Sequence, residues 1–371
     1  MSHRRSPQPI GAGPRDPADA PTGDDEAMHS APSTDASASA ALSSLLPPAV
    51  CVLGLGLIGG SLVRALQDRL PVTGWSPSVS TRDAAAADGL AVADTLEAAL
   101  QAAVRADALV VLASPVTTFR TLLREVAQHA PQVRLTDVAS VKAVVAQEVA
   151  QLVPQARYVG SHPMAGTAAS GWAAGDATLF DRAAWVTCLT EDTEVADWSA
   201  VAALALTVGS RVVPTEAEAH DAAVARISHL PHLMALALAQ AGAQGGELAL
   251  SLAASSFADG TRVAGTRPEL VRAMCEANQV ALVEALDDAL ALLGVARASL
   301  ASTGSLLKIT EGGHRARGLF DHRGAGLQPM TLTGDDLVEQ LLAVGAAGGH
   351  VSGLTGAGAE LSVQAHYPDH Y

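Results

Sequence analysis

Aromatic side chains are scarce in this chain. Its 371 residues include four tryptophans, three tyrosines and four phenylalanines, which together make up 3% of the sequence. Alanine, glycine, valine and leucine dominate instead, so the hydrophobic cores must be built from small aliphatic side chains on closely packed helices and strands. A chain of this length can hold two domains with full cores.

Cysteines are also few. Cys51, Cys188 and Cys275 are odd in number, lie far apart in the sequence and each fall in an apolar segment. Disulfide frameworks use even numbers of cysteines at characteristic spacings, so this pattern predicts buried free thiols in a reducing compartment. We therefore expect a cytoplasmic protein.

Long apolar runs and basic clusters are missing as well. No 18 consecutive residues are all apolar, which argues against a membrane-spanning helix. The formal net charge is −15 and no cluster of Lys or Arg offsets it, so neither a membrane nor a nucleic acid is expected as a partner.

Residues 1–47 lack the apolar stretch of a signal peptide and are rich in Pro, Gly, Asp and Ser, so we expect a disordered leader.

The most informative segment is residues 50–62, VCVLGLGLIGGSL, where a short apolar stretch runs into a G-x-G-x-x-G motif and then a helical pattern. In a strand–turn–helix unit Gly54 allows the tight turn, Gly56 lets backbone N–H groups approach a pyrophosphate, and Gly59 lets the helix pack against the strand. The positive end of that helix would hold the diphosphate. The predicted cofactor contacts are Gly54, Gly56, Leu57, Ile58 and Gly59. The alternative is a purely structural turn, since the chain has 33 glycines.

Strands and helices alternate from this motif to about residue 214. The expected strands are Val50–Leu53, Val72–Ser76, Ala108–Ala113, Val133–Val138, Tyr158–Ser161, Ala184–Leu189 and Arg211–Pro214. This alternation predicts an α/β fold, an N-terminal Rossmann-type doubly wound parallel sheet, over residues 48–214. Ala- and Leu-rich helical patterns then predict an all-helical dimerisation domain over residues 215–295. Residues 296–371 are a C-terminal extension without an assigned role, expected to be a small helical extension or partly disordered.

The end of the second expected strand bears on which dinucleotide is bound. A carboxylate there would hold the ribose hydroxyls of NAD and repel the extra phosphate of NADP, but the first acid after this strand is Asp83. The hydroxyls of Ser76 and Ser78 and the cation of Arg82 can instead hold a 2′-phosphate. We expect NADP or NAD as the cofactor, with a preference for NADP. The alternative is that the serines only cap the next helix and Arg82 is solvated.

Three later segments carry polar groups at the carboxyl ends of expected strands or on the helical side, where an α/β fold places its active site. Ser140 follows one strand and is placed to cap the next helix, and His162 ends another strand, between a serine and a proline. In the third segment, Ser228 is followed by two histidines, His229 and His232. A lone histidine is more often structural than catalytic, but the position of His162 at a strand end favours a functional role.

Five motifs follow one another along about residues 49–295. They are GLGLIGGSL, D-x-x-S-V-K at 137–142, SHPMAG at 161–166, SHLPH at 228–232 and FADGTR at 257–262. Together and in this order they resemble the prephenate/arogenate dehydrogenases of tyrosine biosynthesis. Five ordered motifs are far more specific than the glycine motif alone.

This resemblance implies an NAD(P)-dependent oxidative decarboxylation of prephenate to 4-hydroxyphenylpyruvate, or of arogenate to tyrosine. His162 would accept the proton of the ring hydroxyl while hydride leaves for the nicotinamide, and Ser140 would hydrogen-bond the same hydroxyl or His162. Ser228, His232 and Arg262 would bind the substrate, with Arg262 suited to a bidentate grip on a carboxylate. No metal is implied. The helical domain would bind substrate and form a homodimer.

Two positions depart from the family pattern. Ala168 stands where an acid is expected shortly after SHPMAG, and Val271 stands where an aromatic is expected past the arginine. Both bear on the side chain of the substrate, so prephenate and arogenate both stay open. Two other functions are alternatives: a different dehydrogenase with a helical domain, such as a 3-hydroxyacid dehydrogenase or an imine reductase, and an NADP-sensing regulator without activity.

Overall fold

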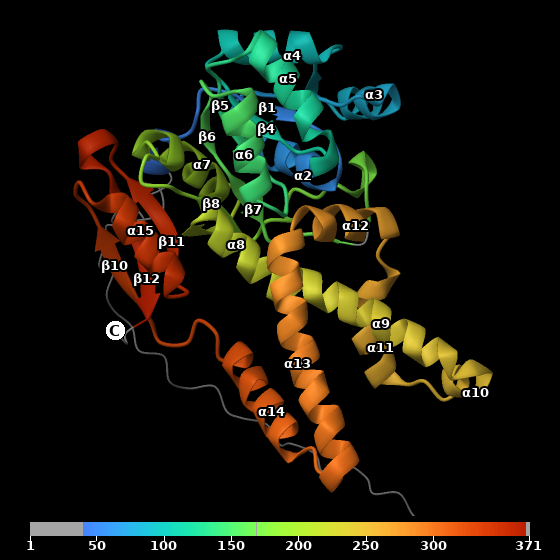
Figure 1. The fold of residues 1–371 in the computed structure, drawn as a ribbon. Coiled ribbons are helices and arrows are strands. Elements are labelled where there is room, and N and C mark those ends of the chain that lie inside the picture. Colours follow the sequence, from blue (N-terminus) through green and yellow to red (C-terminus); the bar gives the residue numbers. More distant parts are fainter. Residues whose placement is uncertain (1–39, 168, 369–371) are drawn as a thin grey trace, which may run out of the picture.

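The computed structural model describes residues 40–167 and 169–368 (Figure 1). The predicted disordered leader lies outside these described residues except for its last part, residues 40–47. Three leucines of that part pack against the main hydrophobic core: Leu42, Leu45 and Leu46. For residues 40–47 the prediction of disorder is therefore wrong, because their apolar side chains have a core to pack against.

A parallel six-stranded sheet forms the first half of the protein, with strand order β3-β2-β1-β4-β5-β6. Its strands are β1 (Val50–Leu53), β2 (Val72–Trp75), β3 (Ala91–Val92), β4 (Leu109–Leu112), β5 (Arg134–Asp137) and β6 (Arg157–Val159). The connecting helices are α2 (Leu57–Leu66), α3 (Val79–Ala87), α4 (Leu96–Arg105), η1 (Val116–Thr118), α5 (Phe119–His129) and α6 (Ala143–Leu152). Alternate residues of β1 belong to two separate core clusters, one with α2 and one with α4, α5 and α6. This order, with helices on both faces, confirms the predicted Rossmann-type domain.

The strands predicted to continue this parallel sheet form a second sheet instead. β7 (Ser161–Pro163) pairs antiparallel with β8 (Ala184–Cys188), and β8 pairs parallel with β9 (Arg211–Thr215) through the crossover helix α7 (Val195–Thr207). Parallel neighbours need a crossover of about a dozen residues or more, whereas only Gly160 separates β6 from β7. The prediction of one continuous parallel sheet is wrong for these strands because the chain changes sheet at Gly160.

The chain after β9 is helical as far as residue 321. Its elements are α8 (Ala217–Val224), the π-helical turn η3 (Ala225–His229), α9 (Leu230–Gln244), α10 (Gly246–Ser251), α11 (Ser255–Thr261), the 3-10 turn η4 (Arg262–Gly265), α12 (Pro268–Ala277), α13 (Gln279–Thr303) and α14 (Leu307–Asp321). This confirms the helical region that the sequence predicts. Helix α13 runs through residue 295, so the predicted boundary falls inside a helix.

One helical run among the described residues, Ala217–Gln244, is long and apolar enough to cross a membrane by length and composition alone. Polar residues interrupt the run, and its longest unbroken apolar stretch, residues 233–239, is far shorter than 18 residues. Three of its polar side chains, His220, Asp221 and His229, are almost completely buried within the protein. These side chains have partners in the folded chain, as described below.

The C-terminal residues return to the second sheet. Their remaining elements are β10 (Leu327–Leu332), α15 (Leu337–Ala346), β11 (His350–Thr355), η5 (Gly358–Glu360) and β12 (Ser362–Pro368). The completed sheet has the order β10-β12-β11-β9-β8-β7, and Figure 1 shows this C-terminal part beside α7. Buried residues of α15 and β11, among them Leu341 and Val351, share a core with α7. The expected small helical or disordered extension is therefore wrong, because these apolar positions extend an existing sheet and core.

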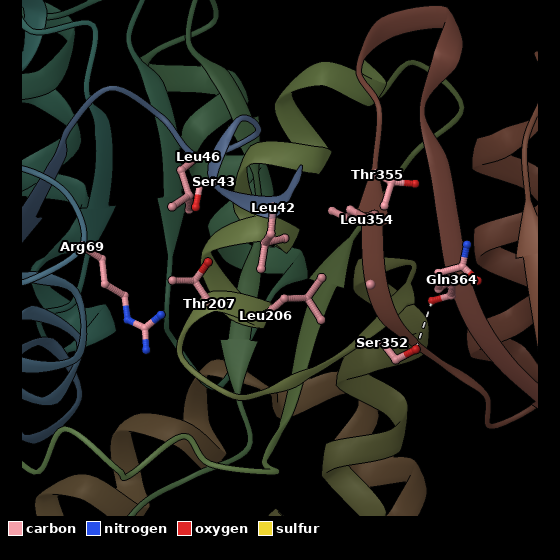
Figure 2. Close-up of a pocket in the computed structure, with 11 residues that line it drawn as sticks. Leu42, Ser43, Leu46, Arg69, Leu206, Thr207, Ser352, Leu354, Thr355 and Gln364 are labelled. Atoms are coloured by element: carbon pink, nitrogen blue, oxygen red, sulfur yellow. Dashed lines mark hydrogen bonds between the residues drawn. The ribbon is translucent and has the colours of Figure 1, made fainter. Parts of the chain in front are cut away.

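A cavity of about 460 Å³ lies where the N-terminal segment, the end of α7 and the C-terminal strands meet (Figure 2). Its lining includes Leu42 and Leu46 from the first, Leu206 from the second and Leu354 from the third. None of its lining residues belongs to the polar cluster around His162 described below.

Candidate active site

The turn between β1 and α2 has the geometry that the glycine motif predicts. Gly54 has a φ of +119°, and a Cβ there would lie 2.6 Å from the backbone of the loop after β4. A Cβ on Gly59 would lie 1.9 Å from the Gly54 carbonyl oxygen, whereas one on Gly56 would meet nothing within 4 Å. Gly56 is the N-cap of α2 and no side chain caps this helix, which begins with Leu57 and Ile58. Open space beside uncapped helix N–H groups fits a pyrophosphate.

The predicted phosphate-binding side chains at the end of β2 are partly used by the protein itself. Ser78 caps α3, and the buried Ser76 accepts the N–H of Ser78 at 3.3 Å. Arg82 is half-buried and donates to the carbonyl oxygen of Ser76 at 2.6 Å. The serine cap of the structural alternative is therefore present, but Arg82 is held at the end of β2 rather than solvated. A role of Ser76 and Arg82 in binding a cofactor stays a prediction.

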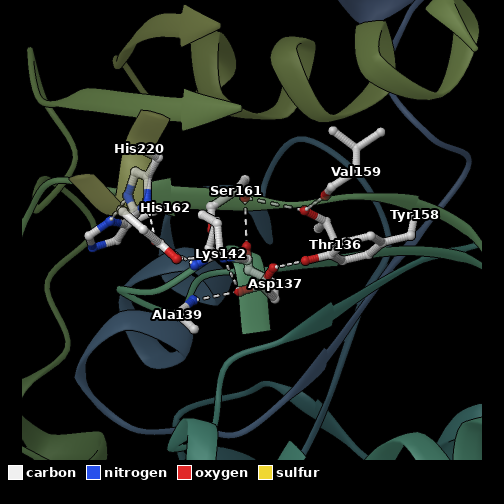
Figure 3. Close-up of polar contacts among 11 residues, drawn as sticks. Thr136, Asp137, Ala139, Lys142, Tyr158, Val159, Ser161, His162 and His220 are labelled. Atoms are coloured by element: carbon white, nitrogen blue, oxygen red, sulfur yellow. Dashed lines mark hydrogen bonds and ion pairs between the residues drawn. The ribbon is translucent and has the colours of Figure 1, made fainter. Parts of the chain in front are cut away.

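His162 lies on β7, the edge strand of the second sheet (Figure 3). Its Nδ1 is 2.9 Å from Nε2 of His220 on α8, and the two ring planes meet at 79°. Nδ1 of His220 is in turn 2.8 Å from Oδ1 of Asp221. The Asp221 carboxylate also accepts the backbone N–H groups of Lys142 and Ala143 at 2.8 and 2.9 Å. Helix α8 thereby connects His162 to the start of α6.

A buried ion pair supports the strand that carries His162. Lys142 is 1% exposed; its Nζ contacts Oδ1 of Asp137 and donates to the carbonyl oxygen of Ser161 at 2.7 Å. The hydroxyl of Tyr158 donates to Oδ2 of Asp137 at 2.6 Å. Hydrogen bonds to both members of the pair offset the cost of burying their charges. Because Ser161 precedes His162 in the chain, the Lys142 contact restrains the backbone of β7 where His162 begins.

The surroundings keep the imidazole of His162 neutral. Burial lowers the pKa of His162 well below its usual value, and the neighbouring His220, Lys142 and His229 lower it further. For Asp221, burial alone would raise the pKa, but hydrogen bonds from His220 and from two backbone N–H groups outweigh it and lower the pKa. A neutral histidine that faces a second histidine backed by a carboxylate is suited to accept a proton.

Ser140 lies half-buried in the loop between β5 and α6. The N-cap of α6 is Lys142, without a side-chain cap, so the prediction that Ser140 caps this helix is wrong. The carboxylate of Asp221, from another helix, takes that place and suits the positive helix end. The side-chain partner of His162 is His220 and not Ser140. A hydrogen bond from Ser140 to a substrate hydroxyl stays a prediction.

Two predicted substrate-binding residues lie at the π-helical turn and on α9. His232 donates through Nδ1 to the carbonyl oxygen of Ser228 at 2.9 Å, so its Nε2 is not used in this hydrogen bond. His229, between them in sequence, is 1% exposed and accepts at Nδ1 from the side-chain amide of Asn278 at 3.2 Å. Burial lowers the pKa of His229 to about 4. Such π-helical turns are frequent at functional sites, and here the turn directs His229 into the interior.

Arg262 is exposed at the start of η4. This turn packs against α9, the helix that carries His232, so the structure brings the elements of these two predicted substrate-binding residues together. Within the part of the chain that the structure describes, no ion pair joins Arg262 to Asp259. Its guanidinium is therefore available to a ligand.

The two positions that depart from the family pattern are placed differently. Val271 is 5% exposed and packs with Cys275 and Leu282 in the core between α12 and α13. Ala168 lies outside the described residues.

Four polar members of the cluster around His162 were not among the residues predicted from the sequence. They are Asp137, Lys142, His220 and Asp221. The first two stand in the D-x-x-S-V-K motif, so their side chains could have been assigned from it. His220 and Asp221 belong to no recognisable motif. Their roles depend on how α8 docks against α6, which the sequence does not show.

A Rossmann-type sheet whose glycine turn fits a dinucleotide, together with a neutral histidine on the strand that follows it, defines a dinucleotide-dependent dehydrogenase. Residues 60–214 match the prephenate dehydrogenase nucleotide-binding domain, and residues 216–304 match the prephenate dehydrogenase dimerization domain. The chain belongs to the prephenate dehydrogenase family, whose members are NAD(P)-dependent dehydrogenases. This family replaces the 3-hydroxyacid dehydrogenases and imine reductases that the glycine motif alone left open.

Curated relatives agree with this family. A prephenate dehydrogenase of Bacillus subtilis is 30% identical over 64% of this chain, and the match spans 66% of that protein. A cyclohexadienyl dehydrogenase of Zymomonas mobilis is 33% identical over 68% of this chain and 88% of that protein.

Solved structures agree as well. A candidate prephenate dehydrogenase of Corynebacterium glutamicum is 44% identical with a TM-score of 0.76, covering 82% of this chain and 98% of that one. The arogenate dehydrogenase of Synechocystis is 32% identical with a TM-score of 0.64, covering 74% of this chain and 99% of that one. The relatives thus belong to one family but are named for different substrates.

Proposed function

We propose that this chain catalyses the NAD(P)-dependent oxidative decarboxylation of prephenate to 4-hydroxyphenylpyruvate, a step of tyrosine biosynthesis. The observation that carries the proposal is the half-buried, neutral His162, hydrogen-bonded through Nδ1 to His220 in a protein whose glycine turn fits a dinucleotide. Membership of the prephenate dehydrogenase family supports this class of reaction.

In this mechanism His162 acts as the base. Its Nε2 accepts the proton of the hydroxyl on ring carbon C4 of prephenate. A nicotinamide cofactor held at the β1–α2 turn would supply the acceptor for the hydrogen on C4, which leaves as hydride. The bond between ring carbon C1 and its carboxylate then breaks, so that CO₂ leaves, the electron pair completes the aromatic ring, and the oxygen on C4 takes the proton back from Nε2 of His162 to give the phenol. A neutral imidazole in a buried site is suited to the first step because it can take up one proton without help from solvent.

We assign the substrate's polar groups to four side chains. Arg262 and His232 bind its carboxylates, with Ser228 beside His232, and Ser140 hydrogen-bonds the ring hydroxyl. Prephenate is a dianion and the formal net charge of the chain is −15, so a local cation is needed to attract and hold it. The position of η4 against α9 supports a joint role for Arg262 and His232.

Arogenate is the second candidate substrate. It differs from prephenate by an amino acid side chain in place of the keto acid. The observation that favours it is the 32% identical arogenate dehydrogenase of Synechocystis. Val271, one of the two positions that bear on this choice, packs in the core and offers no polar group to an amino acid side chain. We therefore keep prephenate first.

We propose that the cofactor is NADP or NAD, with NADP preferred. No carboxylate ends β2, and Arg82 is held there by the carbonyl oxygen of Ser76. The variant Ser76→Asp tests this preference, because a carboxylate would repel the 2′-phosphate and offer the ribose hydroxyls an acceptor. We expect the ratio of kcat/KM for NADP to that for NAD to fall by roughly ten-fold or more. A wild-type enzyme that already prefers NAD strongly would contradict this assignment.

We further propose a cytoplasmic homodimer formed through the helical region. The match of residues 216–304 to a dimerization domain supports the pairing. Helix α13 exposes a series of apolar side chains that a second copy could cover: Val280, Val283, Leu290, Leu292, Leu293, Val295 and Leu300. The three cysteines are free thiols, which agrees with a reducing compartment. Sedimentation equilibrium of the full chain tests the pairing.

Absorbance at 340 nm tests the proposed reaction. Prephenate and arogenate are each supplied with NAD and with NADP, which gives four initial rates. We expect the highest rate with prephenate and NADP. A highest rate with arogenate would select the second candidate, and the absence of any rate with all four pairs would reject the proposed function.

A further inference from the structure

His162 is the first of three hydrogen-bonded groups that lead away from the site. The series runs from Nδ1 of His162 to His220 at 2.9 Å, and from His220 to Asp221 at 2.8 Å. We propose that His220 and Asp221 are positioning residues that keep the proton of neutral His162 on Nδ1 and stabilise His162 once Nε2 is protonated. This inference rests on the proposed role of His162 as the base.

The hydrogen-bond partners of Asp221 fix the direction of the whole series. Its carboxylate faces the backbone N–H groups of Lys142 and Ala143, which can only donate. An ionised carboxylate can only accept, so Nδ1 of His220 must carry a proton and donate it to Asp221. When His220 carries no second proton, its Nε2 has a lone pair, and His162 must donate to it from Nδ1. The lone pair of His162 is left on Nε2, the atom that the proposed reaction requires.

The same series changes the energy of the protonated base. When Nε2 takes a proton, the imidazolium donates more strongly through Nδ1 to His220, and the negative charge of Asp221 stabilises the positive charge through that ring. The charges of His220, Lys142 and His229 all lower the pKa of His162 and so oppose its protonation, whereas the hydrogen bond to His220 and the carboxylate behind it favour it. Burial opposes protonation too. The hydrogen bonds that lead through His220 to the Asp221 carboxylate thus counter a local environment that would make His162 a very weak base.

The series joins the two halves of the protein. His162 lies on β7, within the region that matches the nucleotide-binding domain, whereas His220 and Asp221 lie on α8, within the region that matches the dimerization domain. Asp221 anchors α8 on the N-terminus of α6 through two hydrogen bonds. The base is therefore oriented only when α8 is docked against the nucleotide-binding domain.

Nitrogen NMR of the full chain, labelled with ¹⁵N-histidine, tests the tautomers without any substrate. The signals of His162 and His220 are assigned from the variants His162→Asn and His220→Gln. At neutral pH we expect both rings to be neutral with the proton on Nδ1. A proton on Nε2 of His162 would overturn the proposal even if the enzyme is active, and this readout stands even if the proposed reaction fails.

Kinetics separate positioning from a merely structural role. His220→Phe keeps a ring but removes the acceptor, so we expect kcat to fall by about ten- to a hundred-fold with little change in KM. The acidic limb of the kcat–pH profile should move to lower pH, because His162 loses the hydrogen bond through which the Asp221 carboxylate stabilises its protonated form. His220→Gln retains an acceptor oxygen and should lie between wild type and His220→Phe in both measurements.

A matched control is His129→Gln on α5, which makes the same change in a half-buried histidine whose ring nitrogens lie 3.9 and 3.7 Å from the carboxylates of Glu97 and Glu125. We expect wild-type kcat and pH profile from it. If His220→Phe does not fold, His220→Gln decides: a folded His220→Gln enzyme with wild-type kcat and an unmoved acidic limb would overturn the proposal.

Discussion

At the scale of single residues, His162 is the side chain on which the proposed reaction depends most. The side chain is half-buried, neutral and held by a hydrogen bond on one nitrogen, with the other left for the substrate. Sequence analysis could select His162 because it ends a strand inside a motif. It could not find His220, which stands 58 positions further along and meets His162 only through the docking of α8.

The variant His162→Asn removes the base while keeping a similar size and some hydrogen bonding. We expect kcat to fall by roughly 10²–10⁴, because general base catalysis contributes about that factor. The dissociation constant of the cofactor should stay near the wild-type value, since His162 lies outside the glycine turn. Steady-state kinetics and cofactor titration measure the two effects. An unchanged kcat in His162→Asn would show that His162 is not the base.

The variant Arg262→Ala should act on the substrate far more than on the cofactor. Losing a charge-assisted bidentate pair costs about 2–5 kcal/mol, so KM for prephenate should rise by roughly ten-fold to a thousand-fold or more. Arg262 makes no ion pair with Asp259 in the described structure, so its removal should leave the fold unaffected. Circular dichroism checks the fold, and a near-normal KM would rule out Arg262 as the carboxylate anchor.

At the scale of elements, the glycine turn and the parallel sheet could be predicted because each is encoded locally. Gly54 and Gly59 leave no space for a side chain, and the apolar strands alternate with helices in the sequence. The second sheet could not be predicted in the same way. Strand β7 is only three residues long and takes its partner from β8, and the C-terminal strand β11 pairs with β9, so their pairing depends on contacts distant in sequence.

The variant Gly56→Ala tests whether the β1–α2 turn serves a cofactor rather than the fold alone. A Cβ at Gly56 meets no protein atom within 4 Å, so the free energy of unfolding should change by no more than about 1 kcal/mol. The same Cβ would enter the space required by a pyrophosphate and weaken cofactor binding by about 1.5–3 kcal/mol, or roughly ten- to a hundred-fold. Gly312→Ala on α14, also with open space around it, is the control. Equal cofactor affinity in both variants would favour the purely structural turn.

At the scale of the whole molecule, α8 and its π-helical turn place buried histidines between the two halves. His229 has a pKa of about 4 in the folded chain, below the ordinary value of 6.5, and the pKa of His162 is lowered too. Below pH 6.5, His229 and His162 become protonated in the unfolded chain but stay neutral in the folded chain until the pH is lower. Stability should therefore be greatest above pH 6.5 and be lost as the pH falls toward 4.

Urea unfolding at several pH values measures this effect. From His229 alone we expect the free energy of unfolding to drop by about 2 kcal/mol between pH 7 and pH 5. The variant His229→Gln should show a shallower dependence on pH over the same range. An identical pH dependence in the variant and the wild type would show that His229 is not the responsible group.

The stoichiometry of the reaction tests the central claim most directly. Full-length enzyme is incubated with prephenate and NADP, and the reduced cofactor, CO₂ and 4-hydroxyphenylpyruvate are measured in the same samples over time. The account predicts one of each product per prephenate consumed, at a common rate that collapses in His162→Asn. Reduced cofactor without CO₂ and aromatic product, or no reduction at all, would contradict it.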